Sequence, residues 1–196
     1  MKKGIAALNL VKKILPEKTK LQIYNSLIKP HYEYCSLAWI PGLNKNQIKK
    51  IINIQKQGLR LVYSVKRSHH TAQLFIKSNV TRFDLLFKKS VIELFHKKQL
   101  GMLPKMIEEK LNEFELSKNP RTRNMKIPHF YKKGDLFYEI VNCYNNLPEK
   151  IKEPPKRLFM SKKRIKEFIN NEYIICKEKN CQSCEDTIKL KTATLG

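Results

Sequence analysis

The stretch NKNQIKKIINIQKQGLRLV, residues 44–62, decides the fold class of this chain. It opens with Asn44 and, three residues later, Gln47, which is the residue order of a helix-starting capping box. Apolar positions then recur at intervals of three and four residues, as they do on one face of a helix. That face consists of Ile48, Ile51, Ile52, Gln55, Leu59 and Val62. The pattern predicts a long amphipathic helix.

The same helix carries a second stripe, which is polar and mostly cationic. It consists of Lys49, Asn53, Lys56 and Arg60. At about 100° per residue, this stripe lies roughly a quarter turn from the apolar face. A row of cations on one side of a helix can meet the phosphates of a nucleic acid. We therefore predict that Lys49, Lys56 and Arg60 bind nucleic acid.

Helical spacing extends over most of the remaining chain. It predicts helices over residues 3–15, 17–29, 81–101, 105–114, 135–146 and 161–175. Thr81 and Asp84 stand in capping-box order at the start of the third of these. No alternation of period two persists long enough for a sheet. The expected fold is all-α, a multi-helix bundle.

Two segments lack helical period and divide the chain. Residues 113–134 are rich in charge, proline and asparagine and are expected to form a basic linker. Residues 176–196 contain cysteines but few core residues and are expected to be largely disordered. Helical regions are then expected over residues 1–112 and 135–175. Arg121 and Arg123 in the linker are candidate phosphate ligands, because arginine forks bind phosphate oxygens in pairs.

Charge is the strongest compositional signal. Forty Lys and Arg face seventeen Asp and Glu, which gives a formal net charge of +23. Such an excess points to a polyanionic partner, and nucleic acid is the first expectation. Membrane binding is not expected, because the longest apolar runs are only a few residues. An odd number of cysteines, five, favours a reducing compartment. We expect the protein to act inside the cell, in the nucleus.

Catalytic residues are not apparent in the sequence. Two-metal chemistry requires converging carboxylates, whereas Asp84, Asp135 and Asp186 each stand in a different segment. No nucleophile elbow or glycine-rich phosphate loop is present. His69 and His70 could serve as ligands or acid/base groups, but adjacent histidines after VKRS are more typical of a polar turn. We expect no catalytic site.

A group of cysteines near the end is a candidate zinc site. Cys176, Cys181 and Cys184 have C-x4-C-x2-C spacing, and the two-residue gap suits two corners of a zinc tetrahedron. A fourth ligand could come from Cys143, from His129 or from outside this chain. An unstructured tail without metal is the competing interpretation.

Several short motifs occur in an order that is known from one protein family. They are YNSLIKPHYEYCSLAW (24–39), IINIQKQGLRLV (51–62), GMLPKMI (101–107), RTR (121–123) and YNNLP (144–148). In order and spacing, the chain resembles the C-terminal portion of the reverse transcriptases of non-LTR retrotransposons, of jockey-like and related lineages. The resemblance covers about residues 2–184. Tyr144 departs from it, because a tryptophan is common at that position.

The resemblance implies a thumb subdomain, over residues 1–112, and the connecting region after it. In the family, thumb helices grip the template-primer duplex without sequence specificity, downstream of fingers and palm. The family's catalytic motif, an aromatic-x-Asp-Asp turn in the palm, is not in this sequence, so this chain alone is not expected to polymerise. Met1 could be an internal methionine of a longer reading frame.

The aromatic block at 24–39 has two interpretations. Trp39 and Tyr34 are expected to be core anchors that pack the first helices onto the helix of Gln55. Stacking of nucleic-acid bases on an exposed Tyr32 or Tyr34 is the alternative.

A second functional class also fits the sequence. The chain could be a self-standing adaptor that recruits a protein partner through its helices, with the cysteine group as a small zinc-stapled module.

Overall fold

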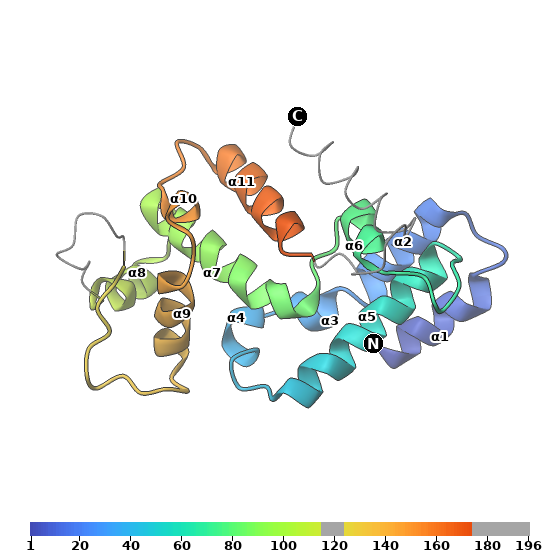
Figure 1. The fold of residues 1–196 in the computed structure, drawn as a ribbon, viewed down its shortest axis with the longest axis horizontal. Coiled ribbons are helices and arrows are strands. Elements are labelled where there is room, and N and C mark those ends of the chain that lie inside the picture. Colours follow the sequence, from blue (N-terminus) through green and yellow to red (C-terminus); the bar gives the residue numbers. More distant parts are fainter. Residues whose placement is uncertain (115–123, 174–196) are drawn as a thin grey trace, which may run out of the picture. The chain divides into compact units, whose positions relative to one another are not determined.

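The computed structural model describes residues 1–114 and 124–173, and in these ranges the protein is all-α, as predicted. The helices (Figure 1) are α1 (Lys2–Val11), α2 (Glu17–Leu27), α3 (Pro30–Glu33), α4 (Ser36–Trp39), α5 (Lys45–Val62), α6 (Ala72–Ser78), α7 (Phe83–Gln99), α8 (Lys105–Asn112), α9 (Leu136–Asn145), α10 (Glu149–Lys152) and α11 (Leu158–Asn171). An isolated bridge at Met125 is the one strand-like residue within these ranges.

All the predicted helices are present, with shifted ends. α1 ends at Val11, four residues before the predicted end, and α11 begins at Leu158 rather than at residue 161. The sequence pattern missed α6 and the four-residue helices α3, α4 and α10.

The chain divides into two compact units. Among the described residues, unit 1 comprises residues 1–35, 43–86 and 169–173, and unit 2 comprises residues 36–42, 87–114 and 124–168. Each unit therefore combines segments that are far apart in sequence. These boundaries differ from the linear regions expected above, whose functional division stays a prediction.

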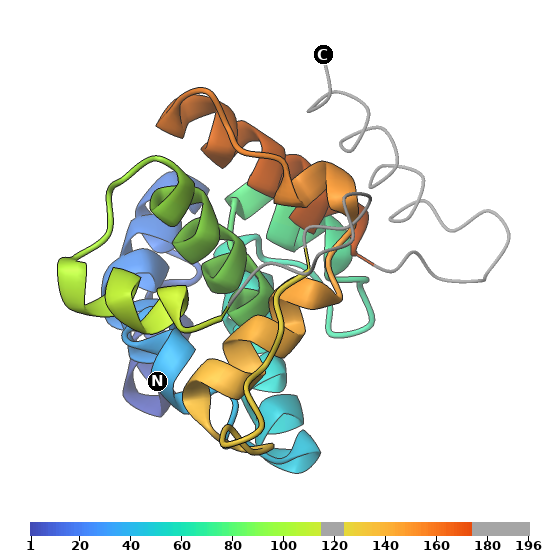
Figure 2. The same ribbon diagram turned by 90° about the vertical axis from the view of Figure 1, so that its left-hand side faces the viewer.

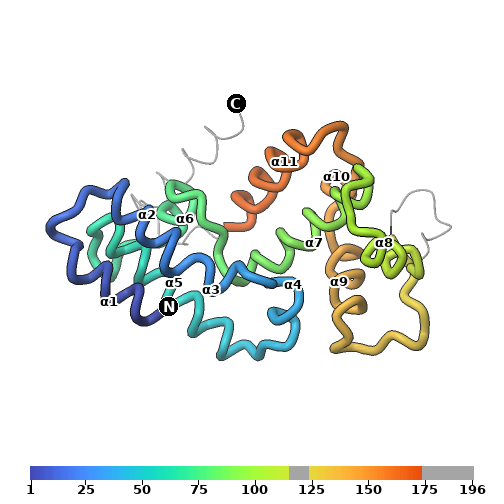
Figure 3. The backbone as a smooth tube through the Cα atoms, turned by 180° about the vertical axis from the view of Figure 1, so that it is seen from behind, coloured from blue at the N-terminus to red at the C-terminus, as the bar shows by residue number. Residues whose placement is uncertain are grey.

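In unit 1, α1 and α2 pack along α5 (Figures 1 and 3). Two glycines permit the close approach. A Cβ atom at Gly58 of α5 would lie 2.6 Å from Cε2 of Tyr24, and one at Gly4 of α1 would lie 2.7 Å from Cγ1 of Ile28. Both distances are too short for carbon atoms in contact. At these two points the backbone of one helix, at a glycine, therefore packs directly against a side chain of another segment.

A buried polar network runs through the core of unit 1. The hydroxyl groups of Tyr24 and Tyr32 are 3.2 Å apart, and both side chains are fully buried. Gln55, also fully buried, accepts a hydrogen bond from the backbone N–H of Phe83 at 2.8 Å and donates one to the carbonyl of Thr81 at 3.2 Å. A glutamine on the apolar face of α5 thus satisfies backbone groups at the start of α7.

The capping box predicted at Thr81 and Asp84 is not the arrangement found. α7 begins at Phe83, and the carboxylate of Asp84 instead accepts two hydrogen bonds from the guanidinium of Arg82, at 2.6 and 2.7 Å. Tertiary contact from Gln55 takes the place of the local cap.

The aromatic anchors differ from those expected. Tyr34 is 78% exposed, so it is not a core residue. Tyr32 is the buried anchor, and its ring meets that of Phe83 edge to face, with centroids 6.5 Å apart. Trp39 is half-buried.

A buried lysine ties the ends of three segments in unit 1. Lys20, 3% exposed, donates to the hydroxyl of Ser64 at 2.8 Å and to the carbonyl of Lys12 at 3.3 Å. Neutral oxygens therefore solvate this ammonium group in place of water.

In unit 2, buried polar side chains join α7, α10 and α11. His96, 1% exposed, lies 2.7 Å through Nε2 from the carbonyl of Ile151 and 2.8 Å through Nδ1 from the hydroxyl of Ser161. A carbonyl only accepts, so Nε2 carries the proton and Nδ1 accepts from the serine. Burial is the main cause that lowers the pKa of His96.

A second buried lysine lies at the junction of α9 and α10. Lys152, 1% exposed, donates to Oδ1 of Asn124 at 2.7 Å, to the carbonyl of Asn145 at 2.9 Å and to the carboxylate of Glu149 at 2.9 Å. The Asn145 side chain also exchanges two hydrogen bonds with the backbone of Met125. Residues 124–134 of the predicted linker accordingly run back beside α9 (Figures 1 and 2).

Candidate nucleic-acid interface

α5 positions the cationic residues that the sequence singled out. The predicted capping box is present, with Asn44 and Gln47 exchanging hydrogen bonds of 2.9 Å between side chain and backbone. Downstream, Gln55, Leu59 and Val62 are buried. The opposite side of the helix is therefore turned away from the core of unit 1.

α5 is strongly basic, and four of its cations lie on one side, about a quarter turn from the buried face. α5 carries five cations and no carboxylate. The cations are Lys45, Lys49, Lys50, Lys56 and Arg60. Lys49 is exposed, whereas Lys56 and Arg60 are half-buried. Without a carboxylate on the same helix, no i, i+4 ion pair within α5 neutralises these charges.

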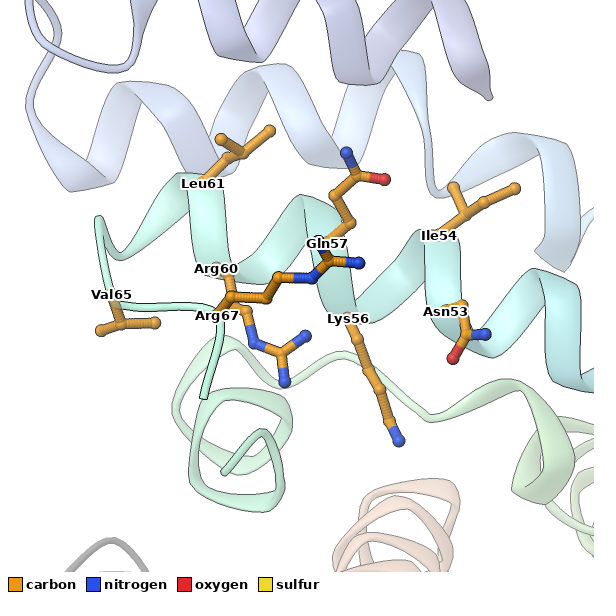
Figure 4. Close-up of a pocket in the computed structure, with 8 residues that line it drawn as sticks. All are labelled: Asn53, Ile54, Lys56, Gln57, Arg60, Leu61, Val65 and Arg67. Atoms are coloured by element: carbon orange, nitrogen blue, oxygen red, sulfur yellow. The ribbon is translucent and has the colours of Figure 1, made fainter. Parts of the chain in front are cut away.

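A hollow of about 710 Å³ adjoins the C-terminal half of α5 (Figure 4), and we call it the α5 hollow. Its lining consists of Asn53, Ile54, Lys56, Gln57, Arg60, Leu61, Val65 and Arg67. In Figure 4, Lys56 and Arg60 leave α5 on the same side, and the Arg67 side chain lies across the helix toward Gln57. Three cations and two amides thus line a hollow that contains no acidic residue.

The sequence analysis did not identify Arg67. This residue follows α5, and the chain between them turns at Ser64, whose φ of +53° lies in the left-handed region. Val65 N–H also bonds the carbonyl of Arg60 at 3.1 Å, which folds the segment back onto the helix end. The only feature of the sequence that could have pointed to Arg67 was the basic run VKRS directly after the helix.

The cations of the α5 hollow destabilise one another's charged forms. Burial lowers the pKa of Lys56, and repulsion from Arg82 and Arg60 lowers it further, against a smaller attraction from Asp84. Burial also lowers the pKa of Arg60, with added repulsion from Arg67. These side chains are held near one another despite like charge, which favours an anion between them.

Arg60 is held in place by one hydrogen bond. Its Nη2 donates to the carbonyl of His69 at 3.1 Å. Its Nε is buried and has no hydrogen-bond partner among the described residues. The Arg60 guanidinium is thus fixed in position but has an N–H donor without an acceptor. A ligand with acceptor oxygens would supply the missing hydrogen bond.

A second hollow, of about 390 Å³, adjoins the N-terminal half of α5, and we call it the Asp84 hollow. It is lined by Lys45, Ile48, Lys49, Ile52, Asn53, Lys56, Arg82 and Asp84. Arg82 is held by the fork with Asp84, by its position 5.6 Å from the Tyr173 ring centroid and by a 3.2 Å bond from its backbone N–H to the Tyr173 hydroxyl. One cation of this hollow is therefore already paired.

The remaining candidates fall into two groups. Arg121, Arg123, Cys176, Cys181 and Cys184 lie outside the described residues. A turn closed by a 3.1 Å bond from the N–H of His69 to the carbonyl of Lys66 leads into His69 and His70, and Nδ1 of His69 lies 2.7 Å from the carbonyl of His70.

The suggested fourth zinc ligands are not part of a cluster that the structure describes. His129 is exposed, and burial raises the pKa of the half-buried Cys143 thiol to about 11. No group of three or more His, Cys, Asp or Glu side chains within residues 1–114 and 124–173 could hold a metal ion. The zinc prediction therefore stays a prediction.

The candidate site is thus a row of cations along one side of α5 that lines two adjoining hollows. In the parts of the chain that the structure covers, no helix is both long and apolar enough to span a bilayer. Phosphate oxygens are the ligands that fit lysine and arginine donors best in such a row. No family model, curated protein or solved structure matches this chain.

Proposed function

We propose that this chain binds nucleic-acid duplexes through the cationic side of α5, without reading their sequence. Five cations on one helix, none of them countered by a carboxylate of that helix, carry the proposal. Backbone phosphates run along both strands of every duplex, so lysines and an arginine in a row suit them whatever the bases are. The formal net charge of +23 favours the same class of partner.

The proposal extends to a place in a larger enzyme. The ordered motifs support the thumb and connecting region of a non-LTR retrotransposon reverse transcriptase, with the bond-forming residues supplied by an upstream palm and fingers. In the two clearest motif segments, Tyr24 and Gln55 are fully buried, whereas Arg60 borders the α5 hollow. A buried Gln55 and an Arg60 that borders the hollow on the same helix, α5, suit a helix that supports a subdomain and also contacts a template.

Filter binding of the full chain to an RNA/DNA hybrid tests the proposal. With four to five phosphate contacts, the logarithm of the association constant should fall with the logarithm of the salt concentration with a slope of about −4. Lys49→Ala and Lys56→Ala should each reduce the slope by about 0.9, because each removes one phosphate contact. Lys18→Ala, which removes an exposed charge from α2, serves as the matched control. A flat salt dependence would refute duplex binding.

One observation favours the alternative adaptor function. Leu10 and Ile14, in α1 and just after it, are 78% and 79% exposed, which is unusual for apolar side chains so close together and suits contact with a protein. Metal analysis separates the two functions. Stoichiometric zinc together with no affinity for the hybrid would favour the adaptor.

A further inference from the structure

We propose that the α5 hollow is a binding site for a terminal phosphate monoester, the phosphorylated end of a nucleic-acid strand. This inference rests on the proposed function and adds a discrete subsite to it. It concerns Lys56, Arg60 and Arg67, of which Arg67 lies outside the helix.

The two hollows beside α5 differ in whether a carboxylate lines them. The Asp84 hollow contains a carboxylate, which already holds Arg82 by two hydrogen bonds of 2.6 and 2.7 Å. The α5 hollow has three cations in its lining and no acidic side chain. Both linings thus carry a net charge of +3, and Lys56 borders both hollows, but only the α5 hollow has no carboxylate in its lining to compete with a bound anion.

The three cations of this lining distinguish between two kinds of phosphate ligand, which differ in charge and in the number of free oxygens. A phosphodiester within a strand carries one negative charge and two free oxygens. A terminal monoester carries about 1.5 to 2 negative charges at pH 7 and presents three acceptor oxygens. Three cationic side chains therefore match a monoester better than a diester, and guanidinium forks bind such oxygens in pairs.

The donors of the hollow are suited to receive this group. Arg60, which lines the hollow, is anchored by its 3.1 Å bond to the His69 carbonyl, and its Nε lacks a hydrogen-bond partner within the described ranges. Arg67 is exposed and lies across α5, so its guanidinium can close over a bound phosphate (Figure 4). The amides of Asn53 and Gln57 supply further neutral donors around the charged ones.

The α5 hollow is also large enough for more than the phosphate itself. Its volume of about 710 Å³ is in the range of small-molecule sites, so the terminal sugar can enter behind the phosphate. The lining groups Ile54, Leu61 and Val65 give that sugar an apolar surface to rest on.

The test compares one RNA/DNA hybrid in three forms: with a 5′-phosphate, with a 3′-phosphate and with hydroxyl groups at both ends. Anisotropy titrations with the full chain should show that a phosphorylated end is bound about tenfold more tightly than the hydroxyl form, from added charge-assisted hydrogen bonds. A preference for either phosphorylated end supports the proposal. Equal affinity for all three forms overturns it and leaves duplex binding intact.

Arg67→Ala and Lys66→Ala form a matched pair, because both residues are exposed neighbours and only Arg67 lines the hollow. Arg67→Ala should remove the preference for the phosphorylated end, whereas Lys66→Ala should keep it. Persistence of the preference in Arg67→Ala refutes the assigned subsite. Failure of every form to bind refutes the proposed function itself. Circular dichroism checks that both variants are folded.

Discussion

Replacement of Gly58 by alanine tests how tightly α2 and α5 pack in unit 1. The added Cβ would lie 2.6 and 3.0 Å from Cε2 and Cδ2 of Tyr24 and 3.1 Å from Cδ1 of Ile5. The shortest of these distances is about 1 Å below an ordinary carbon–carbon contact. The Tyr24 ring is fully buried, and its hydroxyl is engaged with Tyr32, so the ring cannot swing aside freely.

The expected cost follows from two opposing effects. Overpacking of a well-packed core costs about 1–3 kcal/mol, and alanine gains about 0.8–1.0 kcal/mol over glycine as a helix former. Because the contact here is with a constrained ring, we expect a cost in the upper half of that range. Gly58→Ala should therefore lower the free energy of unfolding by about 1–2 kcal/mol.

Urea unfolding of the full chain, followed by circular dichroism, measures this cost. Gly42→Ala is the control, since a Cβ there would meet nothing closer than 3.8 Å. In a Tyr24→Leu background the ring edge is gone, so Gly58→Ala should become neutral or stabilising. A Gly58→Ala protein as stable as the parent, with no coupling to position 24, would refute the close-packing argument.

Three further outcomes are expected. Because burial lowers the pKa of His96, the unfolded chain gains a proton below about pH 6.5 that the folded chain resists, and stability should fall with falling pH. Thermal unfolding of the parent and of His96→Gln at pH 7.5 and 5.5 tests this, and the variant should lose this part of the pH dependence. An equal loss of stability in both proteins would contradict the prediction. Asp84→Asn should raise affinity for the RNA/DNA hybrid several-fold by releasing Arg82, and unchanged affinity in filter binding would show that Arg82 does not face the ligand. Tyr32→Ala should cost about 3 kcal/mol or more in urea unfolding and Tyr34→Ala nearly nothing, and the reverse order would contradict the observed burial.

Local signals in the sequence were sufficient to predict α5 and its ends. The capping box of Asn44 and Gln47 involves residues three apart, so the pattern contains all that the structure uses. α6 was missed because it has seven residues, of which Leu74, Phe75 and Ile76 are consecutive and buried. Such a short apolar run has no helical period to detect.

Features that depend on distant residues were not accessible from the sequence. The Gln55 side chain joins backbone groups 26 and 28 residues away, and nothing local indicates that its amide replaces a cap at the start of α7. Tyr34 was expected in the core, but α3 ends at Glu33 and Tyr34 after it has extended backbone, so Tyr34 does not continue the helical face that carries the buried Tyr32.

The candidate site was predicted in part. The helical stripe gave Lys49, Lys56 and Arg60 as neighbours on α5. Arg67 joins them through a left-handed turn at Ser64. Serine seldom adopts this conformation, and no glycine stands there to indicate the turn in the sequence.

The reactivity of the two buried lysines reports whether the unit around each of them is folded. Lys20 and Lys152 are 3% and 1% exposed, so an amine-acylating reagent that modifies the surface lysines of the native protein should leave these two intact. Lys20 belongs to unit 1 and Lys152 to unit 2. Peptide mass mapping after brief acylation in increasing denaturant would therefore give the denaturant concentration at which each unit unfolds, without any label introduced beforehand.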